Sequence, residues 1–325
     1  LKDGGCGVGL IDCTNRRDAF SNASPDLIPG KDGVFGTGKY PRKLVPKPPL
    51  YADIPRRYHR YGIHPESLRR QALELPRPDL IWVTSHMTYW YPGVFETIAH
   101  LRDLFPSAPI WLGGIYARLC SEHAMAHSGV DRVITQDLED LPTLIEASTG
   151  FKPANGAAWQ SSNVALSPAL DLVPHLTYVP LLTSLGCPFR CPYCASFRLQ
   201  PVRARKSAEG IFKEILRWHD LFHVTDFAFY DDALLLDAET TLKTALGRMA
   251  RQGIPVRFHT PNALHVRALS REWCDLLFAS GFKTIRLGLE TSRRDRQRAW
   301  GGKVESEMFI RSEEHTSELQ SPNTI

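Results

Sequence analysis

Residues 186–194 read GCPFRCPYC and carry three of the seven cysteines of the chain. Cys187, Cys191 and Cys194 follow a C-x3-C-x2-C spacing, directly after an apolar stretch typical of a β-strand. Three cysteines so close together cannot form an ordered set of disulfides, but they can converge on one iron–sulfur cluster. Because four cysteines normally hold such a cluster, three would leave one iron open to a ligand. The alternatives are chance spacing or a zinc site, which usually needs a distant second cysteine pair, and the later Cys274 falls in an amphipathic stretch.

The segment around this motif alternates between the periodicities of strands and helices. Four βα units in a row predict a partial (β/α) barrel of the TIM type or an open parallel sheet. Ser207 is a candidate N-cap, and Gly253 and Gly281 occupy positions typical of C-cap glycines. The predicted strands are 178–184, 226–230, 256–260 and 284–289, and the predicted helices are 207–222, 238–252 and 270–280.

Residues 1–150 have the pattern of a separate Rossmann-like α/β domain with a parallel sheet. Ligands in such sheets bind at the carboxyl ends of the strands. That edge would carry Thr84, Ser85, Gly113 and Gly114. The predicted strands are 8–13, 79–85, 109–112 and 130–134, and the predicted helices are 93–105, 116–126 and 138–147.

A long basic loop is predicted at about 14–75. Between Lys39 and Arg60 it holds seven basic residues and one acid, interleaved with tyrosines. Basic and aromatic interleaving can serve nucleic acid. A solvated loop that wraps its own domain is the commoner case, and we do not expect nucleic acid as a partner.

Composition fits a soluble two-domain chain: 325 residues, 43% apolar and 23% charged. Residues 151–175 have the composition of a linker, and the second domain is expected at 176–310. No apolar run approaches the roughly 20 residues that span a bilayer. No export signal opens the chain, so we expect a cytoplasmic protein with no membrane partner and with cysteines that serve as thiols or metal ligands.

The last residues, 311–325, include RSEEHTSELQS, which resembles a translated sequencing adapter. We therefore exclude them from fold reasoning as a non-native tail. Without them the net charge changes from 39 − 35 = +4 to 38 − 32 = +6, which is only mildly basic. The native chain would then stop near Ile310, short of the roughly 250 residues of a full barrel, and we expect the truncated barrel to be feebly active or inactive.

The cysteine spacing, its position after a first barrel strand and the aromatic Tyr193 before the last cysteine resemble the radical S-adenosylmethionine (SAM) superfamily. In that family three cysteines hold a [4Fe–4S] cluster, and the open iron is chelated by SAM. Reductive cleavage then gives methionine and a 5′-deoxyadenosyl radical. The resemblance implies ligand roles for Cys187, Cys191 and Cys194, and it places the backbone or ring of Tyr193 near the adenine.

The same resemblance implies two further contacts to SAM. The family's second strand often ends in Gly-Gly-Glu, whereas this chain has Tyr230-Asp231-Asp232. Asp231 and Asp232 could accept hydrogen bonds from the SAM ammonium, or they could be an acid pair at a helix N-terminus. The stretch IRLGLET ends with Glu290 and Thr291. Similar members place a SAM-contacting acid at the position of Glu290, although this residue could equally cap the next helix.

The first domain carries VTSHMT (83–88), LGG (112–114) and SGVDRVI (128–134), which resemble the cobalamin-binding domain of one branch of radical SAM enzymes. This resemblance implies that Thr84, Ser85, Gly113 and Gly114 hold the cobalamin nucleotide tail. The Asp-x-His-x-x-Gly motif that supplies a cobalt ligand elsewhere is absent. Cobalamin would therefore bind without a protein histidine, or the domain has lost it.

The expected function is that of a radical SAM enzyme of the cobalamin-dependent type, performing methyl transfer or a rearrangement. Its substrate would be a small molecule or an unidentified compound, and a flavodoxin or ferredoxin would serve as reductant. One alternative is a tRNA methylthiotransferase-like enzyme, which needs three more cysteines and matches Cys6, Cys13 and Cys120 poorly. The other is a non-enzymatic iron–sulfur electron carrier, which would not depend on SAM.

Overall fold

The chain forms two compact units in a computed structural model that describes residues 1–154, 159, 164, 166–300 and 310. The first unit comprises Leu1–Ser161 and Asp171–His175, and the second comprises Ser162–Leu170 and Leu176–Ile325. The excluded tail, 311–325, and part of the expected linker lie outside the described residues. None of the described helices has the length and apolar character needed to cross a membrane.

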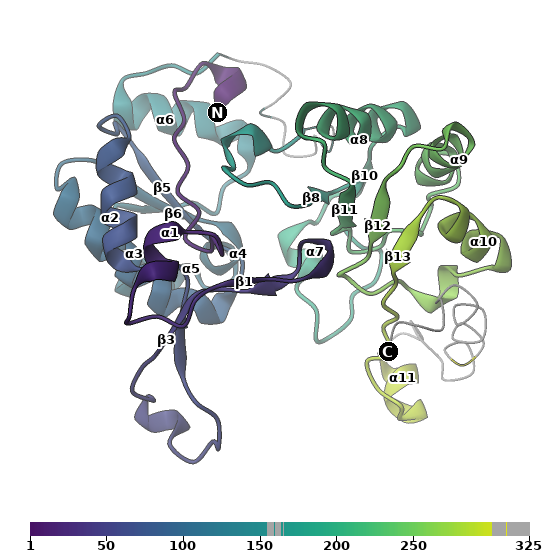
Figure 1. The fold of residues 1–325 in the computed structure, drawn as a ribbon, viewed down its shortest axis with the longest axis horizontal. Coiled ribbons are helices and arrows are strands. Elements are labelled where there is room, and N and C mark those ends of the chain that lie inside the picture. Colours follow the sequence, from purple (N-terminus) through teal and green to yellow (C-terminus); the bar gives the residue numbers. More distant parts are fainter. Residues whose placement is uncertain (155–158, 160–163, 165, 301–309, 311–325) are drawn as a thin grey trace. The chain divides into compact units, whose positions relative to one another are not determined.

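The first unit is built on a parallel sheet of order β5-β6-β7 (Figure 1). Its strands confirm three of the predicted ones and are β5 (Ile81–Ser85), β6 (Ile110–Gly113) and β7 (Arg132–Val133). Side chains of β6 alternate between the two faces of this sheet. Ile110 and Leu112 pack among residues of helices α2 to α5, whereas Trp111 packs with residues of α6.

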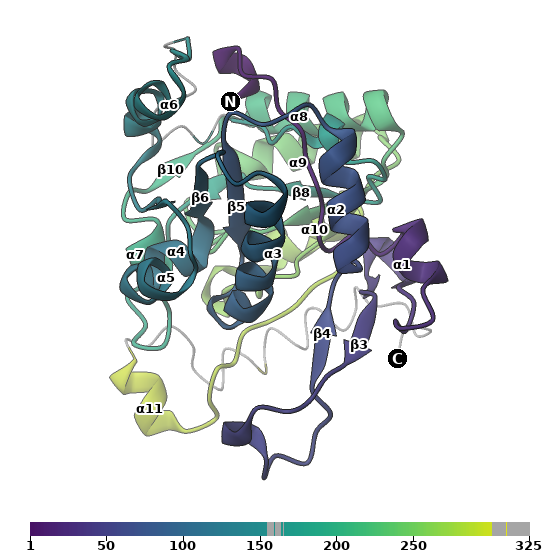
Figure 2. The same ribbon diagram turned by 90° about the vertical axis from the view of Figure 1, so that its left-hand side faces the viewer.

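Helices cover both faces of this sheet, as Figure 2 shows for α3 in front of the strands. They are α2 (Pro65–Glu74), α3 (Tyr91–Leu104), α4 (Gly114–Leu119), α5 (Ser121–His127) and α6 (Leu141–Thr149), and a further short helix of this unit is α1 (Ala19–Ala23). The short 3-10 turns are η1 (Lys2–Gly4), η2 (Val34–Gly36), η3 (Pro49–Tyr51), η4 (Thr88–Trp90), η5 (Leu138–Asp140) and η7 (Leu170–Leu172).

The N-terminal part of this unit departs from the prediction in three ways. Residues 8–13 form no strand, although they are apolar. The helix predicted at 116–126 is broken at Cys120, whose backbone leaves the helical region (φ −132°, ψ 43°). The region expected to be one long loop contains α2, which begins at Pro65 and is capped by the His64 ring accepting from the Glu66 N–H (3.1 Å). Pro65 stands at the first helical position, where proline is favoured, so the sequence indicates the start of this helix.

The basic segment is a hairpin arm, and Arg60 at its base donates to Glu96 of α3 in the same unit (2.5 Å). Its strands are β3 (Arg42–Leu44) and β4 (His59–Tyr61), and a further small hairpin joins β1 (Lys31–Asp32) to β2 (Gly38–Lys39). Figures 1 and 2 show the arm extending away from the parallel sheet of the same unit. Near its tip is a groove of about 570 Å³. It is lined by Leu44, Val45, Pro46, Lys47, Pro55, Arg56, Arg57 and Tyr58.

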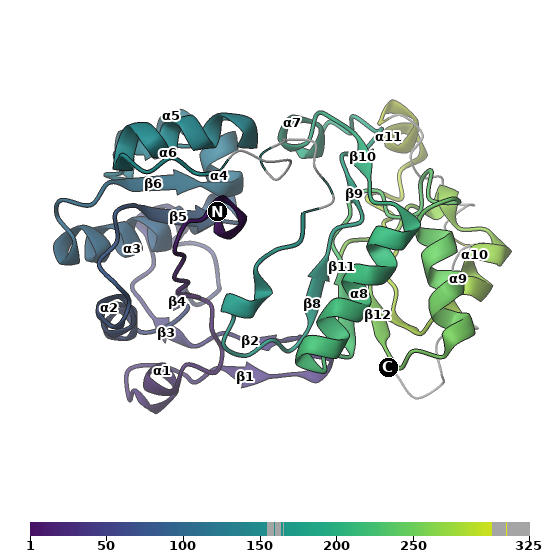
Figure 3. The same ribbon diagram turned by 90° about the horizontal axis from the view of Figure 1, so that it is seen from above.

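The second unit is an α/β unit with a parallel sheet of order β13-β12-β11-β8. Among the described residues this sheet is open. Three helices cover one of its faces (Figures 1 and 3). The strands are β8 (Val179–Leu181), β11 (Asp226–Phe229), β12 (Arg257–His259) and β13 (Phe282–Thr284), and the helices are α8 (Ala208–Phe222), α9 (Leu242–Gln252) and α10 (Arg271–Ala279). The remaining elements are β9 (Ser184–Leu185), β10 (Ala204–Arg205), α7 (Ser196–Leu199), η8 (Val266–Ala268) and α11 (Arg294–Ala299).

Several of the predicted helix ends are confirmed. Ser207 caps α8 by accepting from the Gly210 N–H (3.0 Å), and Ser270 caps α10 in the same way. Gly253 ends α9 in the left-handed conformation (φ +61°). By contrast, β13 lies earlier than predicted, and the stretch after Thr284 contributes only an isolated bridge from Leu287 to Leu264.

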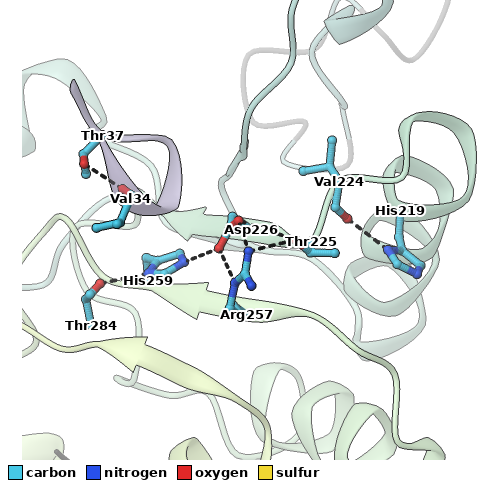
Figure 4. Close-up of polar contacts among 9 residues, drawn as sticks. All are labelled: Val34, Thr37, His219, Val224, Thr225, Asp226, Arg257, His259 and Thr284. Carbon is cyan, nitrogen blue, oxygen red and sulfur yellow. Dashed lines mark hydrogen bonds and ion pairs between the residues drawn. The ribbon is translucent and has the colours of Figure 1, made fainter. Parts of the chain in front are cut away.

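The two faces of the second sheet differ in polarity because alternate residues point to opposite sides. The pairing of β12 with β13 is irregular at this point, so that Phe282 pairs with Phe258 and Thr284 with His259. Four phenylalanines pack together on one face: Phe227, Phe229, Phe258 and Phe282. The opposite face carries a polar network centred on Asp226 (Figure 4). Its carboxylate accepts from Arg257 Nη2 (2.6 Å) and contacts His259 Nε2 (3.0 Å), and His259 Nδ1 contacts Thr284 Oγ1 (3.0 Å). This network joins three neighbouring strands.

Candidate cluster-binding site

The cysteine loop, residues 186–203, is closed at its base by two short strands. Ser184 of β9 pairs with Arg205 of β10, and Leu185 pairs with Ala204. The predicted strand 178–184 is therefore split, because the chain leaves the sheet after Leu181 and joins β10 instead. Gly186 opens the loop with φ +72°, a conformation that disfavours other residues, and a Cβ there would meet the Val202 carbonyl oxygen at 3.0 Å.

The loop holds Cys187, Cys191 and Cys194 within eight residues, and they differ in exposure. Cys191 is buried, whereas Cys194 is exposed and its N–H donates to the Cys191 carbonyl (3.0 Å). The Cys194 sulfur also accepts from the Ser196 N–H (3.4 Å). Cysteine thiolates are the donor type that iron–sulfur clusters use. The three cysteines therefore suit an iron–sulfur cluster. In the described part of the chain, however, no three Cys, His, Asp or Glu side chains lie close enough together to hold a metal ion.

The structure brings two of the residues expected to contact SAM close to the cysteines. Burial, a hydrogen bond with Cys191 and the charge of Glu290 together raise the pKa of Tyr193. The Tyr193 ring also packs edge-on against Trp300, with centroids 5.0 Å apart. Glu290 is exposed and has φ +63°, a rare value for a residue with a side chain. Tyr193 and Glu290 are therefore close enough to interact electrostatically.

The other two expected contacts, Asp231 and Asp232, differ from each other. Asp231 is 2% exposed, and its carboxylate accepts from the Thr183 N–H and hydroxyl and from the Ser184 hydroxyl. Burial raises its pKa, while the hydrogen bonds from Ser184 and Thr183 act in the opposite direction. Asp232 is only partly buried. Local sequence spacing could not predict that Thr183 and Ser184 bind Asp231, because they lie 48 and 47 residues before it.

The glycine pair expected to hold a cobalamin tail is surrounded by its own chain. A Cβ on Gly113 would lie 2.6 Å from Trp82 Nε1, and one on Gly114 would lie 2.5 Å from Thr84 Oγ1. Gly114 also has φ +86°. Close packing of β5 against β6 is therefore sufficient to require both glycines. Ser85 is buried and donates to the Met87 carbonyl (3.0 Å), so of the four expected residues Thr84 is the one with an exposed side chain.

The segment after β5 presents a row of exposed apolar side chains that the sequence analysis did not single out. Met87, Tyr89, Trp90 and Tyr91 are between 36% and 67% exposed, with Tyr89 the most exposed. They follow the carboxyl end of β5, which is where ligands bind in sheets of this type.

Comparison with protein families identifies the second unit. Residues 181–325 match the model of the Radical SAM superfamily. The second unit is a radical SAM domain. This confirms the resemblance drawn from the cysteine spacing.

Two curated relatives also resemble the chain, and both are named as methyltransferases. Cytidylyl-2-hydroxyethylphosphonate methyltransferase of Streptomyces wedmorensis is 20% identical over an alignment of 316 residues. The match covers 79% of this chain and 57% of that protein. The uncharacterized methyltransferase PH0819 of Pyrococcus horikoshii is 26% identical over 133 residues, or 38% of this chain and 28% of the relative. The chain thus spans little more than half of one relative and about a quarter of the other.

Solved structures of TsrM, a radical S-adenosylmethionine methyltransferase from Kitasatospora setae, share the fold. One was solved with tryptophan substrate and a SAM analogue, and another with cobalamin and a [4Fe–4S] cluster. Each superposes with a TM-score of 0.59 at 16% identity over 78% of this chain, and they are covered to 57% and 58%. Relatives named as enzymes favour a radical SAM enzyme over the non-enzymatic electron carrier.

Proposed function

We propose that this chain is part of a cobalamin-dependent radical SAM methyltransferase. Its Cys187, Cys191 and Cys194 would hold one [4Fe–4S] cluster. The observation that carries the proposal is the set of three closely spaced cysteines in a loop that follows the first strand of a radical SAM domain. The loop follows the carboxyl end of β8, and in (β/α) barrels the carboxyl ends of the strands are where substrates meet catalytic groups.

The residues around the loop have distinct tasks in this proposal. A bound cluster would supply the electron that breaks a C–S bond of SAM. Tyr193 would flank the adenine, and its contact with Trp300 holds the ring in place. Glu290 would accept hydrogen bonds from the SAM ammonium, because it is exposed and close enough to Tyr193 to influence the pKa of that ring hydroxyl.

Cobalamin binding is proposed for the first unit. It is supported by the parallel sheet with an exposed Thr84 at its carboxyl edge and by the exposed aromatic side chains after β5, which can cover a broad apolar ring system. The similarity to a structure with bound cobalamin and the names of both curated relatives favour methyl transfer over rearrangement. The reductant is proposed to be a flavodoxin or ferredoxin, since the cluster needs an external electron.

Anaerobic reconstitution with iron and sulfide tests the cluster. We expect about four iron atoms per chain, and none in a variant with Ala at all three loop cysteines, because each supplies one of only three thiolates. Cys274→Ala is the matched control, since this cysteine is buried in α10 outside the loop. Retention of iron in the triple variant would contradict the ligand assignment.

Incubating the reconstituted chain with reductant, hydroxocobalamin and methyl-labelled SAM tests the reaction. We expect only a low yield of 5′-deoxyadenosine or of label on cobalamin, above the level of the triple cysteine variant. A full cluster that neither changes spectroscopically with SAM nor consumes it would point to the electron carrier. A cluster that responds to SAM in a chain that takes up no cobalamin would restrict the proposal to the second unit.

A further inference from the structure

We infer that the turn after β11, residues 231–236, positions the cysteine loop by binding the two segments that flank it. The segment before the loop, 183–185, is its first leg, and the segment after it, 204–206, is its second leg. The key side chains are Asp231 of the turn and Arg205 of the second leg. The inference rests on the proposed cluster site. It assigns Asp231 a role different from direct contact with SAM.

Asp231 holds the first leg. Both of its carboxylate oxygens lie 3.1 Å from the Thr183 N–H, and Oδ1 also accepts from Thr183 Oγ1 (2.8 Å) and Ser184 Oγ (2.6 Å). Thr183 and Ser184 are both at least 97% buried. A carboxylate that accepts from three donors of one segment fixes that segment in direction as well as in position. The first cysteine, Cys187, follows only three residues after Ser184.

Arg205 holds the second leg through the same turn. Its Nη2 donates to the carbonyl oxygen of Ala233 (3.1 Å) and also to that of Leu236. Arg205 is the cross-strand partner of Ser184, so the residue held by Asp231 and the residue held by the turn carbonyls face each other in one pair. The Lys206 N–H adds a bond to the Thr183 carbonyl (2.8 Å). The base of the loop is thereby bound on both sides to the turn after β11.

A third contact supports the loop between its first two cysteines. The Phe189 ring stacks on the His265 ring, with centroids 5.1 Å apart and an interplanar angle of 18°. His265 Nε2 in turn contacts the Asp232 carbonyl oxygen (3.1 Å). The turn after β11 therefore reaches the loop by its backbone as well as by the Asp231 side chain.

Neighbouring residues provide matched controls. Asp232 is adjacent to Asp231 but only partly buried, and it would suit the SAM ammonium if either acid does. Arg203 lies two residues before Arg205 and pairs with Asp237 at the surface, where the side chains are 45% and 70% exposed. A surface pair of this kind contributes little to local order.

The test compares Asp231→Asn and Arg205→Gln with Asp232→Asn and Arg203→Gln in the full chain. In Asp231→Asn an amide N–H would face the Thr183 N–H, so the first leg loses its fit without a change in volume. Positioning groups behind metal ligands typically change metal affinity about 10–100-fold. We therefore expect a chelator to remove the cluster about tenfold faster from Asp231→Asn and Arg205→Gln, with an altered electron paramagnetic resonance spectrum before SAM is added. The two controls should match the wild type in both measurements.

Hydrogen exchange on the cluster-free chain gives a second readout. Amides of 183–194 should exchange faster in Asp231→Asn and not in Asp232→Asn. If Asp231→Asn fails to fold, Ser184→Ala removes one donor and should shift both readouts in the same direction by a smaller amount. Arg205→Lys should restore part of the loss.

The inference is overturned if Asp231→Asn keeps the wild-type cluster, spectrum and exchange but no longer responds to SAM, because Asp231 would then be a SAM contact. It is also overturned if Asp232→Asn and Asp231→Asn are equally impaired. A wild-type chain that takes up no cluster would instead refute the proposed function, while the exchange measurement would still decide whether Asp231 orders the loop.

Discussion

Replacing Asp226 with Asn should destabilise the second unit by about 2 kcal/mol at neutral pH. The carboxylate accepts from Arg257 Nε (2.8 Å) and Nη2 (2.6 Å) and contacts His259 Nε2 (3.0 Å). Bonds to charged groups are worth about 1.5–3 kcal/mol each. The Arg257 side chain is 42% exposed, so water replaces part of what it loses, and we assign that pair only about 1 kcal/mol. The buried contact with His259 adds about 1 kcal/mol, since the amide keeps one acceptor.

The effect should depend on pH. Burial opposes ionisation of Asp226, but the hydrogen bonds and charges of Arg257 and His259 outweigh it and lower the pKa of this carboxyl. A group whose pKa is lower in the folded state stabilises the fold above its unfolded pKa, here about 3.9, and the contribution is lost as the pH falls through the folded value. The gap between wild type and Asp226→Asn should therefore be full at pH 7 and close progressively below about pH 4.

Unfolding in urea, monitored by the hydrogen exchange of peptides from β11 and β12, measures the stability of the second unit alone. With a slope of about 2 kcal/mol per molar urea, the midpoint should fall by about 1 M. Asp237→Asn is the control, because its exposed pair with Arg203 should matter by less than about 0.5 kcal/mol. Equal midpoints for Asp226→Asn and wild type at pH 7, or a gap that widens in acid, would refute the reasoning.

Three further perturbations have expected outcomes. Leu112→Ala should lower the free energy of unfolding of the first unit by about 2–5 kcal/mol, because this side chain is fully buried in its core. Urea unfolding monitored on peptides of β5 and β6 measures this loss. Gly114→Ala should unfold or open the same sheet edge, since its φ of +86° and the contact with Thr84 leave no room for a methyl group, and wild-type exchange of β5 amides would contradict this. Ser207→Ala should cost about 1 kcal/mol by removing the cap of α8, which Ser207→Asp should largely restore in a thermal melt.

Periodic local patterns made most of the sheets predictable. The runs that became β5, β6 and β11 are short, apolar and bounded by turn residues, and the caps of α8 and α10 are visible in the sequence as serines. The apolar run at 8–13 carries the same signal yet forms no strand. Strand formation needs a partner, and a single run does not encode one.

The cysteines of the candidate site were also predictable, because their spacing is local. Their supports were not. Asp231 lies 47 residues from Ser184, and Arg205 lies 31 residues from the Leu236 carbonyl. Such contacts exist only once the parallel sheet brings the ends of β8 and β11 together, so the sequence could suggest that Asp231 mattered without showing what it touches.

The crowding around Gly113 and Gly114 affects how this sheet edge should be interpreted in other proteins. Since the chain's own Trp82 and Thr84 already fill the space above these glycines, a homologue that lost its ligand would still need them. The Gly-Gly pair thus marks the closeness of two strands and cannot distinguish a cofactor-binding domain from a descendant that no longer binds one. Tyr89, the most exposed of the aromatic side chains after β5, takes no part in that packing, so changes there would record the loss of a ligand.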